Sequence, residues 1–324
     1  MKSNPNSVEE LYTGVVENNK VILSQAITLI ESTLPEDMIK GEKLLEKCLP
    51  HTGDSIRIGI TGVPGSGKST FIETFGEIIT NDYKLAVLAI DPSSKKTKGS
   101  ILGDKTRMNN LAINPNAFIR PSPSGKILGG VAAKTREVLL LCEAAGYKCI
   151  IVETVGVGQS ETSVYEMVDF FLLLMLSGAG DELQGIKKGI LEMADLIAIN
   201  KADGDNKEKS KLTKTQINQV LHFFPESDSG IDRQVHLCSA LLNTGIKEIW
   251  DEVQSHHRKT KKSGFYDNLR SDQQLLWMEE YIDRFLSSSF YERNLVANKL
   301  EDIRQQVKNG HMSPQKGARM LINS

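Results

Sequence analysis

Short runs of isoleucine, valine, leucine and phenylalanine recur between residues 56 and 237, and segments long enough for helices separate them. Six of these runs are predicted to be β-strands, at residues 56–60, 85–90, 149–152, 170–176, 196–199 and 235–237. Continuous apolar strands of this kind are typical of parallel sheets covered by helices on both faces. The sequence therefore predicts an α/β protein with a doubly wound, mostly parallel sheet, whose ligand binds at the carboxyl ends of the strands.

Both ends of the chain lack such runs and carry apolar residues at helical spacing instead. This spacing predicts helices within residues 8–50, where Pro35 opens a second helical stretch. Near the other end it predicts one helix marked by Leu275, Leu276, Met278, Tyr281, Ile282 and Phe285, and a second around residues 295–307. We therefore expect three parts: a helical N-terminal arm at 1–50, the α/β domain at 51–258 and a helical C-terminal extension at 259–324.

The composition excludes several classes of protein. The chain has 39 Lys and Arg residues against 41 Asp and Glu residues, a net charge of −2, and 6% aromatic residues, so we expect no nucleic-acid partner. The longest apolar runs are strand-sized and the first 20 residues are polar, so we expect no membrane span, no signal peptide and a cytoplasmic location. Four cysteines without a CxxC pair are expected to be reduced and buried: Cys48, Cys142, Cys149 and Cys238.

Residues 62–70 have the sequence GVPGSGKST, which fits GxxxxGK[ST] and lies between a predicted strand and a predicted helix. Glycines let backbone N–H groups point inward around a phosphate, and the helix N-terminus adds positive potential. Lys68 is expected to contact the β- and γ-phosphates and to act in catalysis, and the Ser69 hydroxyl is expected to bind Mg²⁺. The residues predicted to form this phosphate loop are Gly62, Pro64, Gly65, Ser66, Gly67, Lys68, Ser69 and Thr70.

The nucleotide base is indicated by the sequence NKAD, which directly follows the predicted strand 196–199. It fits the NKxD pattern of GTP-binding proteins. The Asp203 carboxylate can accept hydrogen bonds from both N1–H and the 2-amino group of guanine, which adenine does not offer in that arrangement. Backbone N–H groups after the next strand can contact guanine O6. GTP or GDP is therefore the expected ligand, and its base is expected to contact Asn200, Lys201, Asp203, Ser239, Ala240 and Leu241.

Acidic residues near the ends of predicted strands are candidates for metal binding and catalysis. Glu153 begins the sequence ETVG, where P-loop GTPases usually carry DxxG, so a glutamate replaces the usual aspartate. A carboxylate at that strand end suits a hard cation such as Mg²⁺. Gly156 can donate its amide to the γ-phosphate, whereas Val157 stands where Ras-like proteins have a water-orienting glutamine, which predicts slow hydrolysis. Asp91 and Asp104 each fit a helix cap or a metal ligand, and their context favours the metal.

These segments together resemble the MeaB/ArgK family, the G proteins associated with methylmalonyl-CoA mutase, within the metallocentre-assembly class of P-loop GTPases. The resemblance spans roughly residues 10–250. It depends on GVPGSGKST (62–70), DPSS (91–94), GSILGDKTRM (99–108), FIRPSPSG (118–125), ETVGVGQSE (153–161), SGAGDELQGIKKGI (177–190) and NKAD (200–203). The segments GDKTRM, ETVGVGQSE and AGDELQGIKKG are not general GTPase motifs, so the resemblance is specific.

The resemblance implies a homodimeric GTPase, dimerised through its C-terminal extension, that acts as a chaperone for adenosylcobalamin-dependent acyl-CoA mutases, methylmalonyl-CoA mutase above all. In this function the GTPase gates cofactor delivery and protects the mutase. The resemblance also implies that Ser69, Asp91, Asp104 and Glu153 surround Mg²⁺. It further implies that residues 177–189 form an additional switch that relays the nucleotide state to the mutase.

Two other functions fit parts of the sequence. The first is a kinase that acts on a periplasmic amino-acid-binding protein, an older label within the same family. No separate acceptor site is evident, and NKxD indicates GTP where a kinase commonly uses ATP. The second is a nickel-insertion GTPase, which would favour a histidine-rich tract, whereas the six histidines are scattered except for His256 and His257.

Overall fold

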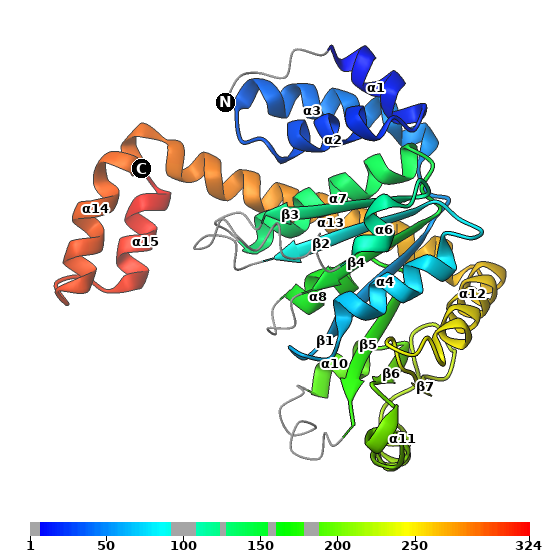
Figure 1. The fold of residues 1–324 in the computed structure, drawn as a ribbon. Coiled ribbons are helices and arrows are strands. Elements are labelled where there is room, and N and C mark those ends of the chain that lie inside the picture. The colour runs from blue at the N-terminus through cyan, green and yellow to red at the C-terminus, as the bar shows by residue number, and fades with distance from the viewer. Residues whose placement is uncertain (1–6, 92–107, 124–127, 155–159, 178–187) are drawn as a thin grey trace. The chain divides into compact units, whose positions relative to one another are not determined.

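The computed structural model describes residues 7–91, 108–123, 128–154, 160–177 and 188–324 (Figure 1). The chain forms two compact units, Met1–Arg270 and Ser271–Ser324. The first unit contains a seven-stranded sheet of order β3-β2-β4-β1-β5-β6-β7, in which all neighbouring strands are parallel. The strands are β1 (Ile56–Gly62), β2 (Leu85–Asp91), β3 (Ala117–Pro123), β4 (Cys149–Thr154), β5 (Phe170–Leu176), β6 (Leu196–Asn200) and β7 (Gln234–Leu237). The predicted parallel sheet is confirmed.

The sequence prediction missed strand β3. This strand contains Arg120 and two prolines, and its apolar run is limited to the three residues 117–119. Among the described strands it lies at the edge of the sheet, beside β2, and an edge strand tolerates proline because one side of its backbone needs no ladder partner. The N-terminal arm contacts this edge: Lys20 Nζ donates to the carbonyl oxygen of Ala117 at 2.6 Å, and Arg120 pairs with Glu31 at 2.6 Å.

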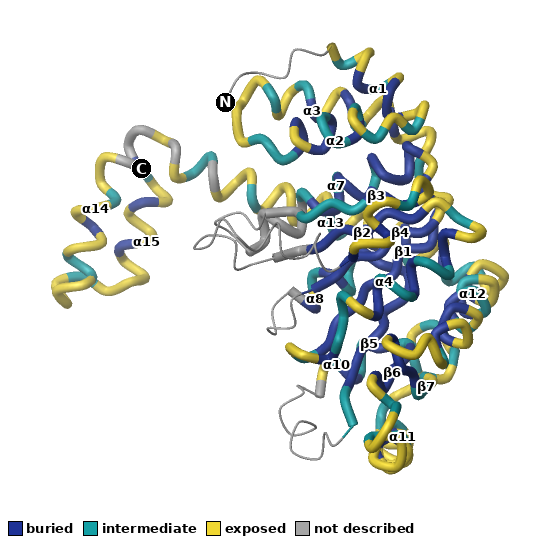
Figure 2. Tube along the Cα trace, in the orientation of Figure 1, coloured by how far each residue is buried: buried dark blue, intermediate teal, exposed yellow. Residues whose placement is uncertain are grey.

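Helices cover both faces of the sheet, so its strands are buried (Figures 1 and 2). One face carries α4 (Lys68–Ile79), α6 (Asn109–Ile113) and α12 (Ile246–Ser263). The other face carries α7 (Leu128–Ala144), α8 (Ser160–Tyr165), α10 (Lys188–Met193) and α11 (Lys207–Leu221). Two short 3-10 turns, Leu49–His51 and Gly204–Asn206, complete the connections. The result is the doubly wound α/β architecture that the sequence predicts.

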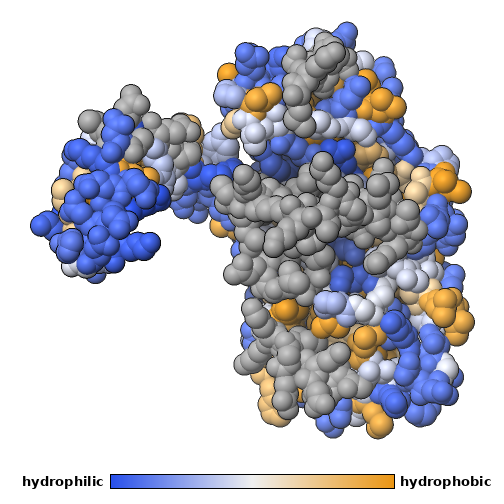
Figure 3. Space-filling model, turned by 60° about the vertical axis from the view of Figure 1, so that its left-hand side comes forward, coloured by the Kyte–Doolittle hydropathy of each residue, from blue (hydrophilic) through white to orange (hydrophobic). Residues whose placement is uncertain are grey.

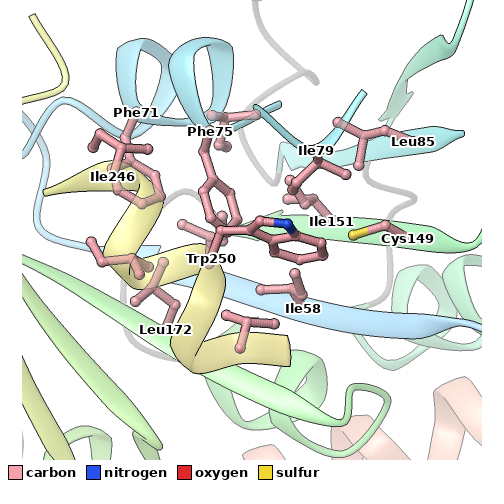
Figure 4. Packing of buried hydrophobic residues seen from close by; sticks show 14 of the residues in the cluster. Ile58, Phe71, Phe75, Ile79, Leu85, Cys149, Ile151, Leu172, Ile246 and Trp250 are labelled. Carbon is pink, nitrogen blue, oxygen red and sulfur yellow. The ribbon is translucent and has the colours of Figure 1, made fainter. Parts of the chain in front are cut away.

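Aromatic side chains fix α4 and α12 to each other and to the sheet (Figure 4). The ring of Phe71 stacks on Phe75 with centroids 5.2 Å apart, and Phe75 meets the edge of Trp250 at 5.8 Å. Ile246 joins the same cluster from the first turn of α12. Large aromatic groups bury much apolar surface, so this cluster holds the two helices firmly against one face of the sheet.

The predicted N-terminal arm consists of three helices: α1 (Val8–Val16), α2 (Lys20–Glu31) and α3 (Pro35–Cys48). Ser7 caps α1 in a capping box with Glu10, and Pro35 occupies the first turn of α3, where its missing N–H costs nothing. The three helices pack on one another and against α7. The arm is therefore part of the first unit.

The second unit contains the rest of α13 (Phe265–Glu292), followed by α14 (Asn294–Lys308) and α15 (Pro314–Ile322). Its small core includes Val296, Ile303 and Leu321. The predicted C-terminal helices are thus confirmed. Residues 258 and 259, where the sequence analysis divides the α/β domain from the extension, lie inside α12.

The four cysteines are all buried and free, as predicted. Among the described residues, no helix combines the length and the apolar character that a membrane crossing requires. On the face shown in Figure 3, hydrophobic residues are scattered among hydrophilic ones.

Candidate functional site

The glycine-rich turn after β1 has a backbone that demands glycine. At Gly62, φ is +153°, and a Cβ would lie 2.3 Å from the carbonyl oxygen of Leu174. Gly65 and Gly67 have φ of +83° and +87°, in the left-handed region that only glycine enters freely. The turn ends at Lys68, the first residue of α4, so the predicted strand–turn–helix context of the phosphate loop is present.

The Lys68 side chain folds back over this turn. Its Nζ donates to the carbonyl oxygens of Gly62, at 2.7 Å, and Val63, at 3.3 Å. Burial lowers the pKa of the Lys68 ammonium, and the nearby carboxylates of Glu153 and Glu161 act in the opposite direction. The ammonium therefore lies inside the turn, bonded to two backbone carbonyl oxygens. An anionic ligand can take the place of these oxygens as the acceptor.

The strand order brings three of the four proposed magnesium ligands to one edge of the sheet. β2, β4 and β1 are neighbours, and Asp91 and Glu153 lie at or near the ends of β2 and β4. Glu153 pairs in register with Ile60 and is 9% exposed, and Ser69 lies in the first turn of α4. A hydroxyl and carboxylates form the all-oxygen donor set that Mg²⁺ prefers, so these residue types fit the ion.

Several predicted site residues lie outside the described part of the chain. They are Asp104, Gly156, Val157 and most of the proposed switch loop at 177–189, and the Asp91 side chain also falls outside.

The predicted base-binding motifs meet at the carboxyl ends of β6 and β7. Asn200 is 1% exposed; its Nδ2 donates to the carbonyl oxygen of Ser66 at 2.8 Å, and its Oδ1 accepts from the Ala240 N–H at 3.1 Å. The Ser239 hydroxyl donates to Asp203 Oδ2. The Asn200 side chain thus links the phosphate loop to the loop after β7, and the three motifs form one site.

Two further residues belong to this site, and no motif in the sequence assigns a role to either of them. Glu161, in the first turn of α8, is 2% exposed and acts electrostatically on Lys68; the segment 153–161 was its only sequence signal. Thr74 on α4 donates its hydroxyl to the carbonyl oxygen of Ala240, at 3.0 Å. No motif contains Thr74, so the sequence alone gave no signal for it.

A parallel sheet with a glycine-rich phosphate loop and an NKxD loop at its carboxyl edge belongs to the P-loop GTPase class. Residues 23–294 match the family model for methylmalonyl-CoA mutase-associated GTPase MeaB, and the chain belongs to this family. The protein is therefore a GTPase that binds guanine nucleotide and hydrolyses GTP.

Similar proteins agree with this assignment. The chain is 44% identical to GTPase ArgK of Escherichia coli over 94% of this chain and 92% of ArgK. It is 39% identical to the mouse mitochondrial methylmalonic aciduria type A homolog, over 98% of this chain and 79% of that protein. A crystal structure described as LAO/AO transport system kinase superposes with a TM-score of 0.78 at 36% identity, covering 100% of this chain and 99% of the other.

Proposed function

We propose that this protein is a GTP-dependent chaperone of an adenosylcobalamin-dependent acyl-CoA mutase of the methylmalonyl-CoA mutase type. It gates delivery of the cofactor to the mutase and protects the mutase. The observation that carries this proposal is the family match over residues 23–294, and the mouse relative named for methylmalonic aciduria supports it.

The phosphate loop is proposed to wrap the phosphates with the backbone N–H groups of residues 62–70. Lys68 then exchanges the carbonyl oxygens of Gly62 and Val63 for oxygens of the β- and γ-phosphates. This exchange is favourable because phosphate oxygens carry negative charge, so they attract the Lys68 ammonium by a Coulombic interaction that a neutral carbonyl oxygen lacks. Gly156 donates its amide to the γ-phosphate in the same proposal.

The base is proposed to lie between the loops that follow β6 and β7. Asp203 accepts from guanine N1–H and the 2-amino group, and the loop at 239–241 offers backbone N–H groups to O6. The hydrogen bond from Ser239 to Asp203 holds the carboxylate in place before the base arrives. The Asn200 side chain keeps the two loops and the phosphate loop in register.

Magnesium is proposed to be held by Ser69, Asp91, Asp104 and Glu153. When bound, the ion supplies positive charge that stabilises the negative charge developing on the phosphates during hydrolysis. The protein itself supplies the oxygen ligands for the ion. Through Lys68 it also places a second positive charge next to the phosphates.

The mutase is proposed to control the rate of hydrolysis. Val157 leaves the site without a water-orienting glutamine, so the protein alone is expected to hydrolyse GTP slowly. The loop at 177–189 follows the core strand β5 and is our proposed transmitter between nucleotide and mutase, since loops carried by rigid strands often bear function. A docked mutase would position this loop and complete the site, as happens in other GTPases.

Steady-state GTP hydrolysis, measured with and without purified methylmalonyl-CoA mutase, tests this function. We expect the mutase to accelerate hydrolysis by the wild type, with less acceleration for Lys188→Ala at unchanged nucleotide affinity. Lys211→Ala, on the exposed face of α11, is the matched control and should respond like the wild type. A mutase that leaves the rate unchanged, and whose loading with adenosylcobalamin does not depend on GTP, would contradict the proposal.

A kinase remains the second candidate because the similar crystal structure is described as LAO/AO transport system kinase. The two functions differ in the fate of the γ-phosphate. GTP labelled in that phosphate, incubated with a periplasmic amino-acid-binding protein, should release only inorganic phosphate if the chaperone proposal is right. Label on the binding protein would favour the kinase.

The protein is also proposed to form a homodimer, and α13 offers a surface for it. Leu275, Met278, Ile282 and Phe285 recur at intervals of three and four residues and are 46–60% exposed. This spacing is typical of a helix that packs along a second helix. We expect Ile282→Asp to shift the sedimentation coefficient towards the monomer, while Asp283→Ser on the same helix leaves it unchanged.

A further inference from the structure

Thr74 connects two parts of the site that are far apart in the sequence. It lies on α4, less than two turns after Lys68, and its side chain is partly buried. Its Oγ1 is 3.0 Å from the carbonyl oxygen of Ala240 and 3.1 Å from the carbonyl oxygen of Thr70. A hydroxyl has a single hydrogen, so the bond within the helix and the bond to the distant loop share one donor. The bond to Ala240 is the one that bears on the base-binding loop.

Ala240 is held at both of its backbone polar groups. Its N–H donates to Asn200 Oδ1 at 3.1 Å, and its carbonyl oxygen accepts from Thr74. The residue is 6% exposed, so both bonds are shielded from water. On the other side of the loop, the Leu242 N–H donates to the Ser239 hydroxyl at 3.1 Å. Side chains from β6, α4 and the loop itself therefore fix the conformation at 239–242.

The ends of this loop are fixed to the same helix. The loop leads from β7 into α12, and Ile246 and Trp250 of α12 pack with Phe71 and Phe75 of α4 (Figure 4). Gly245, at the start of α12, has φ of +72°, and a Cβ there would lie 2.3 Å from the carbonyl oxygen of Leu237. Packing thus fixes the loop ends relative to α4, and the hydroxyl of Thr74 fixes the middle.

The bond from Thr74 also determines where the next amide points. A trans peptide unit is planar, and its C=O and N–H point in opposite directions. Because the Ala240 carbonyl oxygen points to Thr74 on α4, the Leu241 N–H points away from α4. Leu241 itself is 79% exposed, so a ligand can reach this part of the loop.

We propose that Thr74 is a positioning residue for base selection: through the Ala240 carbonyl it aims the Leu241 N–H at O6 of guanine. The helix that begins at the phosphate-binding lysine thereby also orients the base-reading loop. This inference rests on the proposed contact between the loop at 239–241 and guanine, and it adds a residue that touches neither base nor phosphate.

The test compares GDP with a ligand that lacks the 6-oxo group, the diphosphate of 2-aminopurine riboside. This ligand also lacks the N1–H that Asp203 is proposed to accept, but that loss is the same for every variant, so each variant is compared with the wild type on the same ligand. Dissociation constants for both are measured by titration calorimetry on wild type, Thr74→Val, Thr74→Ser and Thr215→Val. Thr215 on α11 is the matched control, because its hydroxyl donates to the Lys211 carbonyl oxygen at 3.1 Å in the same helical bond and lies on a different helix.

We expect Thr74→Val to weaken GDP binding roughly three- to tenfold, the equivalent of one hydrogen bond, and to leave binding of the 2-aminopurine nucleotide unchanged. Thr74→Ser retains the hydroxyl and should bind GDP like the wild type. Thr215→Val should match the wild type for both ligands. A thermal unfolding scan of each variant separates this effect from a loss of stability, which would weaken both ligands alike.

Two results would overturn the inference alone: equal weakening of both nucleotides by Thr74→Val, or unchanged GDP binding in that variant, each with a wild type that prefers GDP. A wild type that binds the two nucleotides equally would instead refute the proposed reading of O6, and the role of Thr74 with it. The two proposals therefore fail in distinguishable ways.

Discussion

The two edges of the central sheet use buried polar groups in opposite ways. At the amino edge, Arg57, Glu143, Asp169 and Arg270 neutralise one another. At the carboxyl edge, Lys68 and Asn200 donate to backbone carbonyl oxygens of the phosphate loop. The arginines and carboxylates at the amino edge are paired with one another, so they do not need a ligand to balance their charge. The Lys68 ammonium, which bonds to backbone carbonyl oxygens, can exchange them for a charged acceptor, so of these two groups of described residues the one at the carboxyl edge is suited to bind phosphate.

The amino-edge cluster is closed and deeply buried. Glu143 accepts from Arg57 Nε at 2.9 Å and from Arg270 NH1 at 3.1 Å, and Arg270 also donates to both oxygens of Asp169, at 2.5 and 2.8 Å. The Tyr266 hydroxyl donates to the carbonyl oxygen of Ser55 at 2.9 Å. Bidentate pairs of this kind are strong and have fixed geometry. The cluster therefore fastens the start of α13 to β1 and β5.

The largest effect is expected from opening this cluster. Glu143→Gln removes one of the two carboxylates and leaves Arg57 and Arg270 with Asp169 alone from this cluster, so one buried positive charge is no longer balanced within it. This should lower the free energy of unfolding by about 3–5 kcal/mol. Urea unfolding followed by circular dichroism measures it. Glu208→Gln, which breaks an exposed pair with Lys211, should leave the unfolding curve unchanged. A loss as small as that of the control would mean that the cluster does not stabilise the fold.

At the other edge the largest effect should be on the ligand. Lys68→Ala removes a charge that is proposed to contact two phosphates, so affinity for GDP should fall roughly a hundredfold or more, given about 1.5–3 kcal/mol for each charged hydrogen bond. The midpoint of urea unfolding without nucleotide should stay at the wild-type value, because the Lys68 ammonium donates to carbonyl oxygens of the turn and its side chain is not part of the apolar core. Wild-type affinity in this variant would remove the phosphate-binding role.

A smaller change at the same edge tests the base. Asp203→Asn replaces a double acceptor with an amide, and this should weaken GTP binding roughly tenfold to a hundredfold and favour xanthosine triphosphate, whose 2-oxo group can accept the new donor. Competition between the two nucleotides measures the switch. Equal preference in wild type and variant would contradict the guanine-reading role of Asp203.

The smallest effect is a pH dependence at the amino edge. Burial by itself raises the pKa of the Glu143 carboxyl, but Arg57 and Arg270 outweigh it and lower the pKa to about 2, from an ordinary value of 4.5. Because the pKa is lower in the folded state, this stabilisation is complete above pH 4.5 and is lost as the pH falls towards 2. Its share of the free energy of unfolding should drop by about 1 kcal/mol between pH 7 and pH 4.

Urea unfolding at these two pH values checks this dependence. Glu143→Gln serves as the reference, since it has no carboxyl to titrate at this position. If the free energy of unfolding fell by the same amount in wild type and Glu143→Gln between pH 7 and pH 4, Glu143 would not be the group that causes the pH dependence.

The sequence predicted the central strands of the sheet correctly, but it did not reveal the edge strand β3. The predicted strands in the middle of the sheet, such as β1 and β5, are buried on both faces and therefore have continuous apolar sequences. β3 lies at the edge, where burial demands less of the sequence, and its Arg120 and prolines concealed it. Exposed residues at helical spacing, such as Leu275 and Ile282, predicted the helix α13 correctly.

The sequence by itself determined the chemistry that depends on neighbouring residues. The turn around Gly62 and Gly67, and the NKAD segment ending at Asp203, each lie within a few positions, so local backbone geometry forms them wherever strand and helix flank them. Only the tertiary structure decided which distant groups meet: Thr74 with Ala240 across 166 positions of sequence, and Arg57 with Glu143 across 86. Packing of helices on the sheet sets these contacts, and no spacing within a short segment encodes them.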